Sequence, residues 1–309
     1  MDRREFFKKS ILTGIATGAA MTFGDFSKIF AGKLPPEMPA GPYDLVAVKG
    51  GEPAQMFDKA IESLGGMKAF VKKGQTVVVK PNIGWDTTPA RAANTNPELV
   101  KRIIEQCFNA GAKSVHVFDN TCDNWNKCYE NSGIQKAVGD AGGKLVPGNI
   151  ESNYKEVDVK SGKKLKNAKV HELIVNSDVF INVPVLKVHS SSQITACMKN
   201  HMGIVWDRRF WHRNDLHQCI ADFAAYRKPN LNVVDAYRVM TKNGPRGVSD
   251  DDVVLMKSLI LSKDIVAADA AAAKMLGLEP SSIPYIQLAH EAGLGAIDLS
   301  KLSINRIKI

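Results

Sequence analysis

Cysteine is scarce in this chain, and its spacing fits no common metal motif. No two cysteines are placed as Cys-x-x-Cys. Ferredoxin-type clusters and zinc ribbons need such pairs, because their ligands must converge on one metal centre. We therefore expect no iron–sulfur motif of the chain's own, while the cofactor stays unknown and a metal ion stays possible in principle. The cysteines are Cys107, Cys122, Cys128, Cys197 and Cys219.

Long apolar runs are also missing. The run from Ile11 to Phe23 has about 13 residues and is interrupted by Gly14 and Gly18. A membrane-spanning helix needs about 20 apolar residues. We therefore expect no stable transmembrane segment, and a short apolar run after a basic start is instead the layout of a secretory signal.

The basic start contains an arginine pair. Residues 2–8 read Asp-Arg-Arg-Glu-Phe-Phe-Lys, which resembles the twin-arginine export consensus. We expect residues 1–31 to be a twin-arginine signal peptide and residues 32–43 to be a proline-rich linker, with Ala20 as a second candidate cleavage point. This predicts a periplasmic protein that meets the twin-arginine translocase during export. The alternative is a basic amphipathic amino terminus.

Acidic residues are fewer than basic ones. The chain has 41 Lys and Arg against 32 Asp and Glu, a formal charge of +9, and removal of residues 1–31 leaves +7. Such a charge favours small anionic ligands. The lysines are spread along the chain without a basic helix or an aromatic RNA-binding motif, so we expect no nucleic-acid partner.

Apolar and amphipathic segments alternate from residue 44 to the end. This alternation predicts one α/β domain over residues 44–309, with a mainly parallel sheet and flanking helices. A lysine-rich polar segment over residues 151–172 predicts a small β insertion, with a hairpin near 156–164, or a seam between two lobes. The expected strands are 45–48, 76–80, 114–118, 144–146, 179–183, 231–234 and 258–261, and the expected helices are 54–64, 97–110, 128–141, 194–202, 216–226, 267–275 and 284–291.

Polar side chains follow several of these strands. Ligands in open α/β sheets bind at the carboxyl ends of the strands, and alternate residues of an extended segment face the same side. We therefore expect these side chains to line one cleft, although polar residues also terminate strands for no functional reason. They are Lys80, Asn82, Asp119, Lys187, His189 and Asp235.

The densest polar segment runs from Lys187 to His217 and holds four of the seven histidines. On the predicted helix 194–202, Thr195 and Lys199 are four residues apart and share a face, with Asn200 beside them. Lysines that converge would hold a carboxylate or phosphate. A buried lysine with a lowered pKa would instead act as a base or nucleophile.

Candidate roles follow from side-chain chemistry. We interpret His189, Lys187 and Asp235 as catalytic candidates, because histidine and lysine can exchange protons. A metal ion held by His189, His212 and His217 is a weaker hypothesis, since no His-Glu-x-x-His spacing occurs. The residues interpreted as substrate- or cofactor-binding are Lys80, Asn82, Asp119, Thr195, Lys199, Asn200 and Gly244.

Two further features stay open. Gly244 lies in the turn sequence Asn-Gly-Pro-Arg-Gly, which is either a ligand-closing loop or only a sharp turn. Cys122 and Cys128 are compatible with a disulfide, a metal site or free thiols. Cys107 and Cys197 have apolar neighbours and are expected in the core.

The combination of motifs resembles a known family. Lys187-x-His189, Thr195-x-x-x-Lys199-Asn200-x-x-Gly203 and Gly244-Pro245-x-Gly247 are similar to the family called domain of unknown function 362. The segments 80–86 and 93–97 resemble its twin-arginine-exported branch. Many relatives have Thr where this chain has Val188, and some carry ferredoxin-like segments that this chain lacks. The resemblance covers residues 44–277 and implies a ligand site without naming a reaction.

Together, these features predict an exported protein that binds an anionic substrate or cofactor. The favoured interpretation is an enzyme with redox or metal-assisted chemistry. Two other function classes fit as well. One is a periplasmic protein that binds an anion without turnover. The other is an accessory protein for electron transfer or cofactor maturation, which would have a redox partner.

Overall fold

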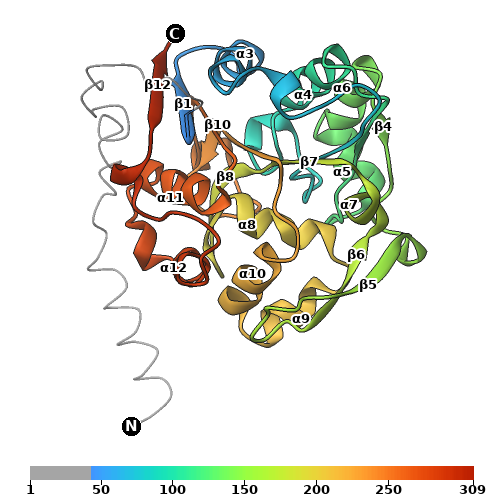
Figure 1. The fold of residues 1–309 in the computed structure, drawn as a ribbon, viewed down its shortest axis with the longest axis vertical. Helices are drawn as coiled ribbons and strands as arrows, with labels where there is room; N and C mark the ends of the chain where they lie inside the picture. Colours follow the sequence, from blue (N-terminus) through green and yellow to red (C-terminus); the bar gives the residue numbers. More distant parts are fainter. Residues whose placement is uncertain (1–42) are drawn as a thin grey trace.

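A central sheet organises residues 43–309, which are the part of the chain described by the computed structural model. The predicted signal peptide and the linker up to residue 42 lie outside these residues. Eight strands follow one another across the sheet in the order β12-β1-β11-β10-β7-β2-β3-β4 (Figure 1). Their bounds are β1 Leu45–Lys49, β2 Thr76–Pro81, β3 Ser114–Val117, β4 Lys144–Leu145, β7 Val179–Val183, β10 Leu231–Met240, β11 Val253–Ser262 and β12 Ile304–Lys308.

Most strand pairs in this sheet are parallel, which confirms the predicted α/β class with a mainly parallel sheet. Within the order of eight strands, the exception is β11, which pairs antiparallel with both β1 and β10. Two strands lie beside the main order, because β8 (Val185–His189) pairs with β10 and with the short β9 (Gln193–Thr195). The sheet is therefore mixed, and its parallel strands β2, β3 and β7 end at a common edge.

Helices cover both faces because strand residues alternate between two apolar cores. Val77 and Val79 of β2 belong to one core, and Val78 belongs to the other. The first core contains residues of α3 (Pro53–Ser63), α4 (Pro97–Asn109), α5 (Trp125–Asn131) and α6 (Ile134–Asp140). The second contains residues of α8 (Cys197–Asn200), α10 (Leu216–Ala224), α11 (Ile265–Met275) and α12 (Pro284–Glu291).

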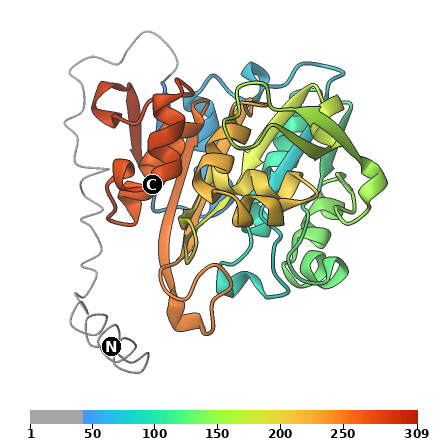
Figure 2. The ribbon, with the colours of Figure 1, turned by 90° about the horizontal axis from the view of Figure 1, so that it is seen from below.

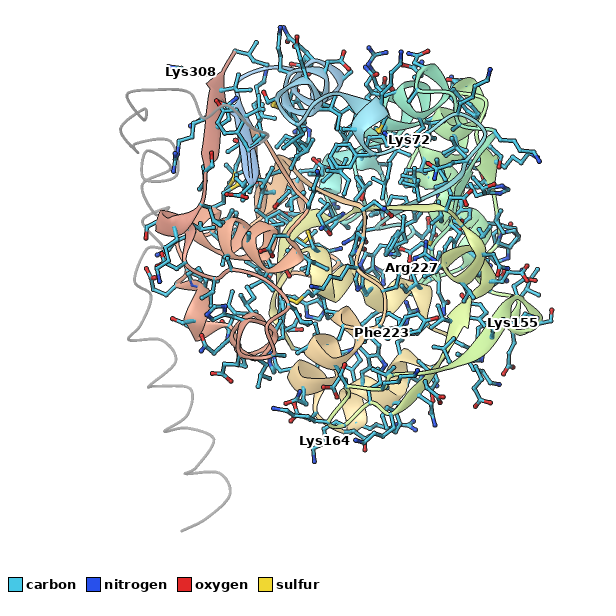
Figure 3. All side chains as sticks on the ribbon, in the orientation of Figure 1. Lys72, Lys155, Lys164, Phe223, Arg227 and Lys308 are labelled. Carbon is cyan, nitrogen blue, oxygen red and sulfur yellow. The ribbon has the colours of Figure 1, made fainter. Side chains whose placement is uncertain are left out.

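The figures show the same division of apolar and charged side chains. Phe223 lies inside the second core, whereas Lys155 and Lys164 project outward (Figure 3).

The carboxyl-terminal segment with α11, α12 and β12 lies at the opposite end of the molecule from the segment that leads to β4 (Figure 2). The strands between these two ends come from several parts of the chain, since β1, β11, β10, β7, β2 and β3 lie between β12 and β4.

The predicted β insertion is present, but its strands differ from the expected ones. A separate antiparallel hairpin is formed by β5 (Tyr154–Asp158) and β6 (Asn167–His171), and α7 (Glu172–Asn176) follows it. The polar residues expected in the hairpin around 159–164 instead form most of its connecting loop. The short helix α9 (Arg208–Arg213) lies near this hairpin (Figure 1).

Two helix predictions are wrong in detail. The expected helix 128–141 consists of α5 and α6, because Gly133 has a φ of 74° and interrupts the helix. The expected helix 194–202 begins too early, because residues 193–195 form β9 and only 197–200 form α8. Thr195 and Lys199 therefore lie on different elements.

No helix within residues 43–309 combines the length and the apolar character needed to cross a bilayer.

Candidate anion-binding site

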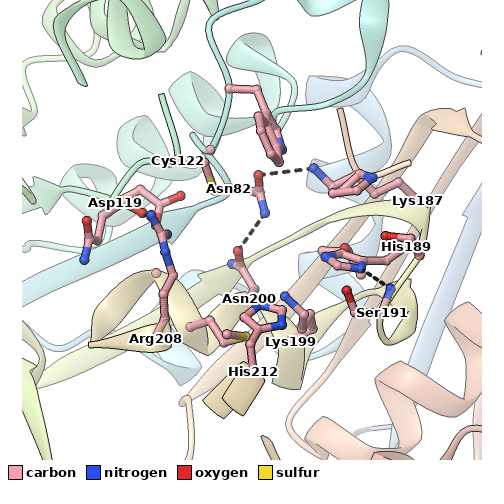
Figure 4. A pocket seen from close by; sticks show the side chains of 18 of the residues that line it. Asn82, Asp119, Cys122, Lys187, His189, Ser191, Lys199, Asn200, Arg208 and His212 are labelled. Atoms are coloured by element: carbon pink, nitrogen blue, oxygen red, sulfur yellow. Dashed lines mark hydrogen bonds between the residues drawn. The ribbon is translucent and has the colours of Figure 1, made fainter. Parts of the chain in front are cut away.

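A cavity of about 310 Å³ lies at the carboxyl ends of β2, β3 and β8 (Figure 4). We call it the strand-end cavity. The structure brings together in it nine of the residues that the sequence marks as site candidates. These are Lys80, Asn82, Asp119, Lys187, His189, Thr195, Lys199, Asn200 and His212.

A buried ion pair forms one wall of the strand-end cavity. Lys80 Nζ lies 2.8 Å from Asp119 Oδ1 and donates a hydrogen bond of 2.9 Å to Asn200 Oδ1. The other Asp119 oxygen accepts from the backbone N–H of Ile83 at 2.6 Å. Burial lowers the pKa of Lys80, while Asp119 opposes that effect. Because Lys80 and Asp119 are 1% and 2% exposed, their charges depend on each other.

Gly203 makes room for this ion pair. A Cβ atom at this position would overlap Asp119 Oδ1 and come within 2.5 Å of Lys80 Nζ. The Gly203 carbonyl also accepts a hydrogen bond of 2.9 Å from the backbone N–H of Asn120. Only glycine therefore fits here without moving the pair.

A chain of buried asparagines leads from Lys80 into the sheet. Asn200 Nδ2 donates to Asn182 Oδ1 at 2.9 Å, and Asn182 Nδ2 donates to Asn232 Oδ1 at 3.1 Å. Asn232 Nδ2 then donates to the backbone carbonyl of Ser262 at 3.4 Å. All three amides are 2% exposed or less, so this network holds Asn200 in one orientation.

Lys187 is buried without a carboxylate partner. Its Nζ donates to the backbone carbonyl of Ala93 at 2.5 Å and to Asn82 Oδ1 at 3.5 Å. Burial lowers its pKa to about 7, with Lys199 adding to the effect and Cys122 opposing it. Near neutral pH, Lys187 therefore exists in both its charged and its neutral form.

Two cavity side chains have polar groups without partners. Within residues 43–309, Lys199 Nζ has no hydrogen-bond or ion-pair partner, and burial lowers its pKa to about 8. Thr195 lies opposite Lys187 in the pairing of β9 with β8. Its hydroxyl oxygen is buried and has no hydrogen-bond partner. Buried polar groups are nearly always satisfied, so the Thr195 hydroxyl is suited to hydrogen-bond a bound molecule. The Lys199 ammonium is half-buried and has its donors directed to the same cavity.

The two cavity histidines are neutral. His189 Nδ1 accepts from the backbone N–H of Ser191 at 3.1 Å, which leaves the proton on Nε2. Burial lowers the pKa of His189 to about 2, and Lys199 and Lys187 add to the shift. Burial also lowers the pKa of His212, followed by the effect of Lys199. His189 is thus a neutral hydrogen-bond donor, not a group that changes charge near neutral pH.

Three of the predicted site residues lie outside the strand-end cavity. Asp235 is buried, accepts from the backbone N–H groups of Asn96 and Tyr237 at 2.7 and 3.0 Å, and has its pKa raised by burial to about 6. Gly244 packs closely against the backbone carbonyl of Val188. His217 stacks on Tyr285 with ring centroids 6.0 Å apart. These three residues support neighbouring structure instead of facing the cavity.

His217 therefore lies apart from His189 and His212, so the three histidines proposed as metal ligands do not form one site. Among residues 43–309, no group of three or more His, Cys, Asp or Glu side chains could hold a metal ion. Of the three alternatives left open for Cys122 and Cys128, the structure has free thiols. Cys128 is buried and Cys122 is exposed at the cavity, whereas Cys107 and Cys197 lie in the core as expected.

The cavity also contains residues that were not among the sequence candidates. Arg208 donates to the backbone carbonyls of Asn120 at 2.6 Å and of Thr121. Arg209, Cys122 and Gly203 line the cavity as well. The adjacent arginines in the densest polar segment were a usable signal, because arginine favours anions. Gly203 was part of the family motif and Cys122 had several open roles, but the place of each in the cavity depends on tertiary contacts.

The charge of the cavity lining is strongly unbalanced. Among its lining residues, Asp119 is the one carboxylate, and there are five cationic residues. One of these cations, Lys80, is neutralised by Asp119. Among the other four, Lys187 is buried, Lys199 and Arg208 are half-buried and Arg209 is exposed. Burying a charge without a counter-charge is costly, so a bound anion would offset that cost at Lys187. The cationic lining residues are Lys80, Lys187, Lys199, Arg208 and Arg209.

Comparisons with known proteins give one family match and one similar curated protein. The family model described as "Domain of unknown function (DUF362)" matches residues 77–274. A thylakoid-associated protein from Synechocystis sp. is 27% identical over 242 residues, which cover 76% of this chain and 73% of that protein. The matched segment includes the predicted site residues from Lys80 to Gly244.

Comparison with solved structures finds the lactate racemase apoprotein from Thermoanaerobacterium thermosaccharolyticum among the similar chains. The TM-score is 0.46 at 13% identity, and the alignment covers 80% of this chain. The chain spans 58% of the length of that protein.

Proposed function

The chain belongs to the DUF362 family, and on this premise we propose that its strand-end cavity binds a small carboxylate or phosphate and that Lys187 exchanges a proton with the bound molecule. The observation that carries this proposal is the charge of the lining, where five cationic residues surround about 310 Å³ and face one carboxylate. That volume suits a small ligand.

Lys199 is the main anion-binding residue in this proposal. Its Nζ has no partner within residues 43–309, so its hydrogen-bond donors are available to a ligand. The Thr195 hydroxyl and the neutral His189 imidazole supply further donors on the same cavity. A charged donor with neutral donors beside it is the arrangement that recognises carboxylate and phosphate oxygens.

Lys187 is the residue suited to proton transfer. General acid–base catalysis works best when the pKa of the catalytic group lies near the working pH. Burial brings the pKa of Lys187 to about 7, and the carbonyl oxygens of Ala93 and Asn82 hold its Nζ in place. His189 is less suited to this role because its pKa is lowered to about 2.

Calorimetry with inorganic phosphate tests the binding half of the proposal. Lys199→Met keeps the aliphatic part of the side chain and removes the charge, so we expect a loss of affinity of about 10- to 150-fold, equivalent to about 1.5–3 kcal/mol. The exposed Lys113 lies outside the cavity and serves as the control in Lys113→Met. Equal affinities of the protein and its Lys199→Met variant would overturn the proposal.

Deuterium exchange tests the proton-transfer half. Small 2-oxocarboxylates have acidic C–H bonds beside the ketone, so they should gain deuterium there in heavy water faster with the protein than without it, and Lys187→Met should lose this acceleration. A thermal melt of Lys187→Met, measured in parallel, shows whether this variant still folds. Binding without exchange for every carboxylate would favour the alternative class, a protein that captures an anion without turnover.

We also propose that the protein is exported by the twin-arginine pathway to the periplasm. The support is the arginine pair at positions 3 and 4, followed by a short apolar run. These residues lie outside the described part of the chain. A fold that completes its polar cavity from distant segments suits a pathway that carries folded proteins.

A further inference from the structure

Cys122 is the exposed cysteine of this chain, and it lies in the strand-end cavity. The other four cysteines are buried. Burial raises the pKa of Cys107 and of Cys128 to about 12. Thiol chemistry in the folded protein is therefore concentrated at Cys122.

A backbone hydrogen bond holds the segment that carries this thiol. The backbone N–H of Cys122 donates to the Gly84 carbonyl at 2.8 Å. A Cβ atom placed on Gly84 would lie 3.8 Å from Cys122 Sγ and 3.4 Å from Asn82 Oδ1. The sulfur therefore lies near the Asn82 amide, which accepts from Lys187 (Figure 4).

An independent feature indicates that a ligand belongs beside this sulfur. Thr195 is 3% exposed, lines the same cavity, and its hydroxyl has no hydrogen-bond partner. Lys199, also without a partner, interacts electrostatically with Cys122. A ligand oxygen that satisfies both groups would place the rest of the ligand in the cavity that contains the thiol.

We propose that Cys122 is a covalent modification site selective for anionic electrophiles, which the cavity cations hold beside its sulfur. This inference rests on the proposed anion binding. In the reaction, the thiol gives its proton to solvent and the sulfur attacks an electrophilic carbon. A sulfur–carbon bond forms, and the leaving group departs with its bonding electron pair. The cavity supplies the attraction, since clefts of one charge concentrate ions of the opposite charge.

Two alkylating reagents of similar size test the selectivity. Iodoacetate is anionic and iodoacetamide is neutral, and each transfers its carbon to sulfur and releases iodide. We expect the ratio of their rate constants, iodoacetate over iodoacetamide, to be about tenfold or more higher for the folded protein than for glutathione in the same buffer. Mass spectrometry of peptides should locate the label at Cys122.

Four controls define the result. Lys199→Met should lower the rate ratio toward that of glutathione, whereas Lys113→Met should leave it unchanged. Inorganic phosphate should slow the reaction with iodoacetate by occupying the cavity. Cys122→Ser should prevent labelling, and measurements on the unsubstituted protein decide the question even if that variant fails to fold.

The inference can fail separately from the proposed function. A rate ratio equal to that of glutathione, or a label on another cysteine, would overturn it. If phosphate still binds in calorimetry, the anion site stands and only the role of the thiol is wrong. If phosphate does not bind and the rate ratio is also ordinary, both proposals are wrong.

Discussion

At the scale of residues, the three cavity lysines differ in what surrounds their ammonium groups. Lys80 contacts Asp119, Lys187 contacts two uncharged oxygens, and Lys199 has no hydrogen-bond or ion-pair partner within residues 43–309. The same side chain thus serves as part of a structural ion pair, as a group that titrates near neutrality and as a free donor. Substitution by methionine should separate these roles.

Lys80→Met should mainly reduce stability. Removing one partner of a buried ion pair leaves the other charge uncompensated, which costs about 3–5 kcal/mol. We therefore expect a clear shift of the denaturant midpoint at neutral pH, whereas Lys199→Met should change it little. A Lys80→Met/Asp119→Asn double variant should be less destabilised than Lys80→Met. If Lys80→Met unfolds like the unsubstituted protein, the pair contributes no net stability.

Lys187 should make stability depend on pH. Its pKa is about 7 in the folded protein, below its ordinary value of 10.5. Between these values the unfolded chain binds the extra proton, so stability should rise from pH 7 toward pH 10, by at most about 1.4 kcal/mol per pH unit for one such lysine. Urea titrations across this range should show a smaller rise for Lys187→Met. An equal slope in both proteins would contradict the assigned pKa.

The same titration should weaken anion binding. Sulfate keeps its charge across this range, so a change in its affinity reports on the protein. Because the pKa values of Lys187 and Lys199 are lowered to about 7 and about 8, we expect sulfate affinity to fall by about tenfold or more per lost charge above these values. Constant affinity from pH 6 to pH 9 would show that these lysines do not hold the anion.

Some residue roles were readable from the sequence and others were not. Lys80, Asn82, Lys187 and His189 lie in one cavity, as the alternation along extended segments predicts. The same argument applied to Asp235 placed it in the cleft, but its oxygens accept from backbone N–H groups outside the cavity. Strand position alone cannot tell whether a carboxylate faces a cavity or anchors a neighbouring helix.

At the scale of elements, the regular strands and helices were predictable because their apolar periods are clear. α4 begins at Pro97, directly after Asn96, whose side chain accepts from two backbone N–H groups of the first turn. The β8–β9 hairpin was not predicted, because its strands are short and the segment after residue 194 also has a helical pattern. The pairing of Lys187 with Thr195 across this hairpin depends on tertiary packing, which the sequence pattern does not show.

Substitution of Gly203 tests how closely the η4 segment His201–Ile204 packs against the ion pair of Lys80 and Asp119. In Gly203→Ala the new methyl group would collide with Asp119, so we expect a loss of about 1–3 kcal/mol of stability together with weaker phosphate binding. Gly139→Ala in α6 is the matched control, because a Cβ atom there meets nothing within 4 Å. It should be neutral or stabilising by up to about 1 kcal/mol. Comparable losses in both variants would contradict this view of Gly203.

At the scale of the whole molecule, the sheet brings together side chains from residue 80 to residue 245. The predicted α/β fold explains why this happens, since parallel strands present their carboxyl ends at one edge. The antiparallel position of β11 between β1 and β10 was not predictable, because strand order depends on packing of both faces. The cavity therefore forms only when distant parts of the chain have folded together.

Export should depend on the arginine pair. Replacing Arg3 and Arg4 by lysines preserves the charge but removes the guanidinium groups. Under the export proposal, fractionation of cells should find most of the folded variant in the cytoplasm and the unsubstituted protein in the periplasm. The lysine variants of the cavity should be exported normally if they fold. Unchanged periplasmic yield of the arginine variant would refute this route.

The asparagine chain described above also has a direction. The Ser262 carbonyl can only accept, so it turns the Asn232 NH2 group toward itself and the oxygen of Asn232 toward Asn182. Asn182 and Asn200 have the same orientation, with the NH2 group toward the preceding amide oxygen, so the Asn200 oxygen faces Lys80. The Ser262 backbone carbonyl in β11 therefore determines that the oxygen of the Asn200 amide, and not its NH2 group, faces Lys80. Because an oxygen accepts a hydrogen bond from an ammonium group, the interior of the sheet favours the protonated form of Lys80.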